Sequence, residues 1–241
     1  MTAPRPLLGI GLMLTAMAIL PMIDVLAKTL GEAGLPILVV VWARAIFGTL
    51  MMLPLALRAG GRAALLPDRW VYHAGRAALL YAATFFFFSS LKYLPIADAM
   101  AIFFVNPLIV TILSALVLRE RVGPRRWAAV AVGFLGTLII IRPGLVALNP
   151  GTVLALLAGV SLGSYFIMTR ARAGKTDANL LTFHTSLIGM AGLSALLPLS
   201  WVPPEPQQWL MLVGVGVIAT LGHLLITRAY EQGEASLLAP L

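Results

Sequence analysis

The chain contains no cysteine, which excludes disulfide bonds and thiolate metal sites. Charged residues make up only 11% of its 241 positions, well below the roughly 25% of an average soluble domain. The sequence also lacks a zinc-binding HExxH pair, a phosphate-binding loop, and a serine, a histidine and an acid at usable spacing. We therefore predict no enzyme activity, no cofactor and no metal site.

What the chain has instead is apolar sequence, since hydrophobic residues make up 60% of it and its mean hydropathy is +0.97. About 20 apolar residues in a helix cross a hydrocarbon core of roughly 30 Å, and the helix satisfies its own backbone hydrogen bonds there. Eight such spans are predicted, at residues 7–29, 35–56, 70–91, 96–118, 127–141, 151–170, 178–200 and 209–228. We thus expect an all-α polytopic membrane protein, a helical bundle in the lipid bilayer, with a first span that is not a cleaved signal peptide.

A ninth apolar run begins at residue 235 and has only seven residues by residue 241. A membrane-spanning helix needs about 17 or more. We therefore expect this sequence to be a fragment of a ten-span protein.

The distribution of positive charge predicts the orientation of the chain. A net charge of +8 could suggest nucleic acid, but such binding needs a basic patch on a water-exposed face. Here the cations lie in short loops, so no nucleic-acid partner is predicted. The amino terminus and the loops on its side hold twelve lysines and arginines, and the opposite loops hold three. The positive-inside rule then places the amino terminus in the cytoplasm of a bacterial cell, with the spans in its inner membrane.

A weak internal repeat in the sequence indicates how the predicted spans are arranged. Residues 92–97 (KYLPIA), before the fourth span, are echoed by residues 229–235 (AYEQGEA), before the ninth run. Because five spans separate the two segments, they open on opposite sides of the membrane. Secondary transporters use such inverted repeats to build two alternating openings around one central site.

Residues 91–144 carry a family resemblance. Ala97, the pairs Asn106-Pro107 and Arg119-Glu120, the glycines Gly133 and Gly136, and the closing Arg142-Pro143-Gly144 resemble the first repeat of the EamA family in the drug/metabolite transporter superfamily. The resemblance implies two inverted five-helix repeats, residues 1–144 and 150–241, with the second truncated. It also implies a secondary active transporter for a small organic metabolite, coupled to a proton or sodium, and leaves a homodimer open.

Ionisable groups inside the spans are the first candidates for the site, because such groups are expensive in lipid. Arg44 lies near the midpoint of the second span and could hold an anionic or zwitterionic group of a substrate. Alternatively, Arg44 forms a structural ion pair with Asp24. Asp24 and Lys28, four residues apart on one helix face, are either a helix-end pair or a coupling site. Arg76 is expected to extend to the membrane interface as an anchor.

Prolines at mid-membrane are the second group of candidates. Pro21 and Pro107 remove the hydrogen bonds to the carbonyl groups of Met17 and Phe103. The freed carbonyls either line a substrate cavity or mark only a kink. Asn106 beside Pro107 could donate and accept hydrogen bonds across such a cavity, or hydrogen-bond to another helix.

Aromatic and hydroxyl side chains complete the candidates. Trp42, Tyr81 and Tyr165 are predicted substrate contacts, although packing against a neighbouring helix also explains Trp42. Lesser candidates are Thr185, Thr220, His184 and His223. The small residues Ala155, Gly159 and Gly163, and likewise Gly133 and Thr137, are interpreted as helix-packing seams.

The substrate stays open at this stage. The pattern of Asp24, Lys28, Trp42 and Arg44 in the first hairpin resembles that of family members suggested to take up riboflavin or S-adenosylmethionine. Export of amino acids or drug-like amines is an equal alternative. A protein of another class, a non-transporting membrane assembly protein, is the further alternative.

Overall fold

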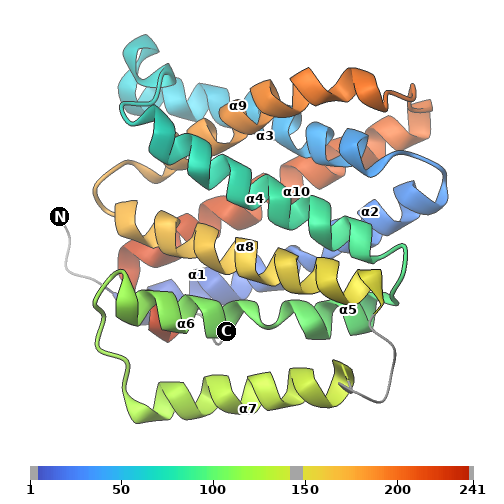
Figure 1. Cartoon of the computed structure of the whole chain (residues 1–241). Helices are drawn as coiled ribbons and strands as arrows, with labels where there is room; N and C mark the ends of the chain where they lie inside the picture. Colours follow the sequence, from blue (N-terminus) through green and yellow to red (C-terminus); the bar gives the residue numbers. More distant parts are fainter. Residues whose placement is uncertain (1–4, 142–148, 239–241) are drawn as a thin grey trace.

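A computed structural model of the chain describes residues 5–141 and 149–238, and every long element in them is a helix (Figure 1). The helices are α1 (Pro6–Ile19), α2 (Pro21–Glu32), α3 (Ile37–Gly60), η1 (Arg62–Leu65), α4 (Trp70–Ser90), α5 (Ile96–Phe103), α6 (Asn106–Leu116), α7 (Pro124–Ile141), α8 (Pro150–Arg172), α9 (Ala178–Leu196), η2 (Leu197–Leu199), α10 (Pro206–Gln232) and α11 (Ala235–Leu238). The closing Arg142-Pro143-Gly144 motif and the predicted repeat boundary lie outside the described residues.

Helix starts follow from local sequence. Proline stands in the first turn of α1, α2, α6, α8 and α10, where its missing N–H removes no intrahelical hydrogen bond. The side chain of Asn149 accepts a hydrogen bond from the Gly151 amide at 2.8 Å and so caps α8. Asp177 does the same for α9 through the Asn179 amide. These caps place the helix starts within a few residues of the predicted span starts.

Six helical segments of the described chain are long and apolar enough to cross a membrane, at Pro6–Glu32, Ile37–Gly60, Ile96–Leu116, Pro150–Arg172, Ala178–Leu199 and Pro206–Gln232. This supports the predicted polytopic α-helical membrane protein. Helices α4 and α7 coincide with the other two predicted spans but are not among the six. The count of eight spans therefore stays a prediction.

Two of the spans are broken helices. Leu20 separates α1 from α2, and Phe104 and Val105 separate α5 from α6. Each break directly precedes or includes the turn that holds a proline, Pro21 in one case and Pro107 in the other. A proline cannot donate the backbone hydrogen bond that would continue the helix. In the structure, both breaks lie next to the prolines that the sequence singled out.

The bundle packs by helix pairs that are distant in sequence, chiefly α4 with α8, α3 with α9 and α1 with α10. Glycines of α8 let the break in the fourth span come close, because a Cβ atom on Gly159 would lie 2.8 Å from the Phe103 carbonyl oxygen. A Cβ atom on Gly163 would lie 3.1 Å from the Asn106 carbonyl oxygen. The packing seam on α8 is therefore confirmed. In α7, by contrast, a Cβ atom on Gly133 would meet nothing within 4 Å.

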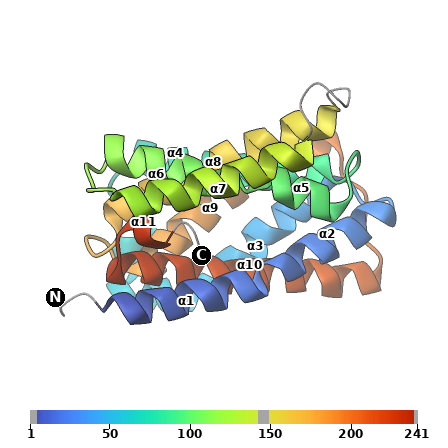
Figure 2. The same cartoon turned by 90° about the horizontal axis from the view of Figure 1, so that it is seen from below.

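One end of the bundle collects the amino-terminal start of α1 and the connections α3–α4, α6–α7, α8–α9 and α10–α11, while α7 lies at the margin beside α5 and α6 (Figures 1 and 2). Four charged residues link the α6–α7 connection, the start of α7, the end of α8 and the α10–α11 connection. We call them the charged clamp: Glu120, Arg126, Arg170 and Glu234. Arg126 pairs with Glu234 at 2.7 Å, and Arg170 pairs with Glu120 at 3.2 Å. Arg170 also donates to the Tyr230 carbonyl oxygen at 2.6 Å. The clamp thus ties the α6–α7 connection to the ends of α8 and α10.

Candidate functional site

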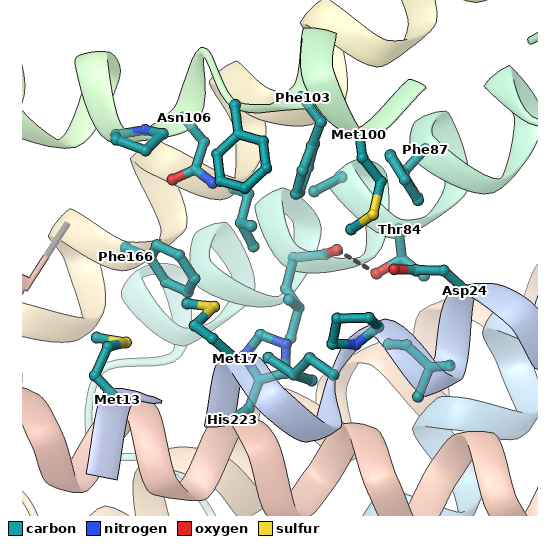
Figure 3. A pocket seen from close by; sticks show the side chains of 18 of the residues that line it. Met13, Met17, Asp24, Thr84, Phe87, Met100, Phe103, Asn106, Phe166 and His223 are labelled. Atoms are coloured by element: carbon teal, nitrogen blue, oxygen red, sulfur yellow. Dashed lines mark hydrogen bonds between the residues drawn. The ribbon is translucent and has the colours of Figure 1, made fainter. Parts of the chain in front are cut away.

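A cavity of about 190 Å³ lies at the centre of the bundle (Figure 3). Most residues of its wall are apolar, and methionines and phenylalanines are prominent among them: Met13, Met17, Phe87, Phe88, Met100, Phe103, Phe104 and Phe166. Figure 3 shows Met100, Phe103 and Asn106 on one side of the cavity and Met17 and His223 on the other. Flexible thioethers and aromatic rings adapt to varied apolar shapes. The wall is therefore suited to the apolar body of a small molecule.

Both helix breaks border this cavity. Pro21 lies in its wall from α2, and Asn106 and Pro107 lie in its wall from α6. The structure therefore brings together three of the candidates that the sequence suggested. Broken helices expose polar backbone at mid-membrane only where protein or a cavity covers it.

Arg44 of α3 projects into the same cavity and is only 5% exposed. Its Nη1 atom donates a hydrogen bond to the Thr84 hydroxyl of α4, which itself donates to the Leu80 carbonyl oxygen at 2.9 Å. The guanidinium carbon lies 5.9 Å from the centre of the Tyr81 ring, a cation–π distance. Its Nη2 atom is buried and has no hydrogen-bond partner among the described residues. Arg44 thus retains an unused donor.

Asp24 is buried at 9% exposure and lines the cavity, but it does not form an ion pair with Arg44 within 4.0 Å in the described chain. Lys28 pairs instead with Glu32, at 3.9 Å and on the partly exposed surface of α2. The structure therefore places Asp24 at the cavity and Lys28 away from it.

Beyond Arg44 lies a small second space that we call the polar chamber. It holds about 10 Å³, room for one water-sized atom. Its lining is Arg44, Leu80, Tyr81, Tyr165, Thr182, Thr185, Ser186, Ala219, Thr220 and His223. The threonine hydroxyls donate to carbonyl oxygens of their own helices, for example Thr220 to Gly216 at 2.7 Å. The predicted Tyr81 and Tyr165 therefore meet at this chamber.

Trp42 is not part of either space. Its indole Nε1 atom donates to the Ser194 hydroxyl at 2.9 Å, and its ring meets the Trp201 ring edge to face at 5.9 Å. These contacts join α3 to α9 and the segment that follows it. The structure therefore gives Trp42 the packing role that the sequence left as its alternative.

The prediction that Arg76 extends to the membrane interface as an anchor is wrong, because Arg76 is fully buried. It donates to the Leu181 carbonyl oxygen at 3.2 Å and to the Thr169 hydroxyl at 3.1 Å. Its guanidinium also lies 5.3 Å from the centre of the Tyr165 ring. A depth count along one helix missed these partners because they belong to α8 and α9. Arg76 joins three helices beside the polar chamber.

Sequence reasoning missed several lining residues as well. Thr84 and Ser186 gave no signal, because single hydroxyls in spans usually bond to their own helix. Gly189 was missed too, although a Cβ atom there would overlap the Tyr81 ring. Gly189 therefore gives Tyr81 its place beside the chamber. No group of three His, Asp or Glu side chains in residues 5–141 and 149–238 is gathered as a metal site requires.

Comparison with known proteins adds independent findings. Residues 7–142 and 149–241 match the model of the EamA-like transporter family. A riboflavin transporter of Vibrio cholerae serotype O1 is 30% identical over 98% of this chain and 80% of its own. The pseudopaline exporter CntI of Pseudomonas aeruginosa is 27% identical over 86% of this chain and 73% of its own. An S-adenosylmethionine uptake transporter of Rickettsia prowazekii is 25% identical over 90% of this chain and 73% of its own. A solved crystal structure with 22% identity has a TM-score of 0.70 over 94% of this chain and 82% of its own, which supports the fold alone.

Proposed function

Since the chain belongs to the EamA-like transporter family, we propose that it is a secondary active transporter, which moves a small organic metabolite across the bacterial inner membrane by alternating access. It is a multi-pass bacterial membrane protein and a small-molecule transporter, not an enzyme. The observation that carries the proposal is the central cavity, where two broken helices meet a buried arginine with an unused donor.

Two inverted repeats, at residues 1–144 and 150–241, account for the helix packing. If α8, α9 and α10 correspond to α1–α2, α3 and α4, exchanging the repeats turns the α1–α10 pair into the α4–α8 pair and leaves α3–α9 unchanged. The α3–α10 contact likewise becomes the α4–α9 contact. Both pairs of contacts are present, and the two matched ranges of the family model support the same division. A pseudo-twofold arrangement of this kind provides two alternating openings.

The substrate is proposed to place its apolar body against the methionines and phenylalanines and an acidic or carbonyl group at Arg44. Asn106 and Tyr81 supply further polar contacts, and Asp24 is the proposed coupling site for a proton or sodium. Relatives named for riboflavin and S-adenosylmethionine support uptake of such metabolites. The exporter relative supports the alternative, export of an amino acid or amine. The excess of positive charge at the amino-terminal end supports a cytoplasmic amino terminus.

The test is flux through purified protein in liposomes, measured with a panel of metabolites under a proton or a sodium gradient and in both directions. Arg44→Ala should abolish flux, and Arg44→Lys should also fail if the planar, two-pronged donor is needed. Arg58→Ala is the matched control, because Arg58 lies at the exposed end of the same helix. Unchanged uptake in Arg44→Ala would contradict the proposed role. No flux of any metabolite would favour a non-transporting assembly protein.

A further inference from the structure

We infer that the polar chamber is a binding site for one small monovalent anion, which contacts the Nη2 atom of Arg44. The anion is either a halide ion or one oxygen of an acidic group, and only the second source rests on the proposed transport of a metabolite. The chamber adjoins the larger cavity and shares Arg44, Leu80 and His223 with it. Hydroxyl-bearing side chains make up most of the rest of the chamber wall, whereas methionine and phenylalanine line the cavity.

The first argument for an anion is the charge balance around Arg44. Arg44 is 5% exposed, and no aspartate or glutamate is among the described residues that line the chamber. Among the described residues, Asp24 has the only carboxylate on the larger cavity, and this carboxylate is more than 4.0 Å from the guanidinium. Buried charges in proteins are normally paired, because an isolated ion in a low-dielectric medium is strongly destabilised. Asp24 acts on Arg44 only from this distance, and a bound anion supplies the direct contact with a negative charge that Asp24 does not make.

The second argument is that Arg44 and His223 have nitrogens available as hydrogen-bond donors. The Nη1 atom of Arg44 donates to Thr84, and Nη2 is its buried nitrogen without a partner among the described residues. Nη2 is therefore a donor available to a ligand. His223 is 7% exposed, and its Nδ1 atom is also buried without a hydrogen-bond partner among the described residues. In the tautomer that protonates Nδ1, this atom becomes a second donor. Arg44 and His223 both line this one water-sized space, and each has a buried nitrogen without a partner among the described residues. This pair favours a ligand that accepts hydrogen bonds.

The same geometry excludes a cation. Hydroxyl oxygens such as those of Thr182, Thr185 and Thr220 are ligands that sodium accepts. A sodium ion in a space of about 10 Å³ would, however, lie directly against the guanidinium of Arg44. Like charges at such a distance in a medium of low dielectric constant repel each other strongly. The chamber therefore selects an anion.

Gly48 of α3 offers a way to close the chamber. A Cβ atom there would lie 2.7 Å from the Thr220 hydroxyl oxygen and 3.0 Å from that of Ser186. Gly48→Ala therefore pushes both hydroxyl groups into the space without removing any of its polar atoms. Gly75→Ala is the matched control, because a Cβ atom at Gly75 would meet Met168 at an ordinary 3.5 Å.

The experiment is thermal unfolding of the purified protein in detergent, with no cargo and no gradient, in sodium gluconate and with chloride, bromide or formate replacing gluconate at constant ionic strength. A ligand at ten times its dissociation constant stabilises by RT ln 11, about 1.4 kcal/mol. The expected rise of Tm is therefore about 3–6 °C and saturable. The rise should disappear in Gly48→Ala and in Arg44→Met and persist in Gly75→Ala.

The outcomes separate the two sources of the anion. A rise with chloride and bromide assigns a halide, and a rise with formate alone assigns the acidic group of a cargo. Equal Tm in all four salts, or a rise that survives in both Gly48→Ala and Arg44→Met, overturns the inference. Because no flux is measured, an anion effect without transport would count against the proposed function alone, and transport without an anion effect would count against this site alone.

Discussion

The two buried arginines should respond in opposite ways to the loss of their charge. Arg44 and Arg76 are 5% and 0% exposed, and neither pairs with a carboxylate within 4.0 Å in the part of the chain that the structure describes. Replacing either by methionine keeps most of the side-chain volume and relieves the desolvation of the ion. Desolvation is common to both changes, so it largely cancels when the two variants are compared.

What differs is the number of contacts that each arginine makes. Arg44 donates one hydrogen bond to another side chain, that of Thr84, and its guanidinium lies 5.9 Å from the Tyr81 ring. Arg76 donates two hydrogen bonds, and its ring contact is closer, at 5.3 Å. A hydrogen bond to a charged group contributes about 1.5–3 kcal/mol. Arg76→Met should therefore be less stable than Arg44→Met by about 2 kcal/mol, equivalent to roughly 4–8 °C in Tm.

The two variants should therefore differ in which property they lose, transport or stability. Arg44→Met is expected to unfold at or above the wild-type temperature and to lose transport, whereas Arg76→Met should unfold earlier and keep a measurable rate in the molecules that remain folded. The assays are thermal unfolding in detergent and flux in liposomes on the same preparations. Equal Tm values for the two variants, or wild-type flux in Arg44→Met, would refute the reasoning.

Two further substitutions, each compared with a control variant, test other parts of the structure. Gly189→Ala should displace the Tyr81 ring and reduce the free energy of unfolding by about 1–3 kcal/mol, whereas Gly192→Ala, one turn later with open space beside it, should change it little. Thermal unfolding checks both, and equal effects would show that the ring does not depend on Gly189. Glu120→Gln should reduce the free energy of unfolding by about 1 kcal/mol, because it weakens the charged clamp. Glu32→Gln should change it by no more than about 0.5 kcal/mol, because Glu32 is 69% exposed and lies 3.9 Å from Lys28. Denaturant titration of both variants decides this, and a larger loss for Glu32→Gln would contradict it.

Most of the fold was predictable from the sequence because lipid restricts the choice of structure. The lengths of the apolar runs predicted the helices, and Pro21 and Pro107 predicted the helix breaks. Both predictions depend on the residues of one helix alone and not on the helix that packs against it. The reach of Arg76 was not predictable, because its acceptors belong to helices about ninety to a hundred residues away in the chain. The site was predictable only in part for the same reason.

Polar candidates for the site stood out against an apolar background, and Arg44, Asn106 and Tyr81 do meet at the two central spaces. Apolar wall residues gave no such contrast, since Met17 or Phe103 would look the same on a lipid-facing helix. For Trp42 the sequence suggested a ligand contact because its aromatic ring is close in sequence to Arg44. Its position two residues from Arg44 turns it toward Ser194 instead.

The charged clamp has a consequence for the rate of the proposed transport cycle. Its outer pair, Arg126 with Glu234, is 29% and 47% exposed, so water can hydrate both side chains as soon as they separate. An exposed ion pair contributes only about 0–1 kcal/mol. Under alternating access, release of this end is therefore a cheap and reversible event. The barrier would arise mainly from the buried apolar contacts at this end, among them those of Tyr230 and Leu238. Raising the ionic strength should therefore speed opening without changing which molecule is carried.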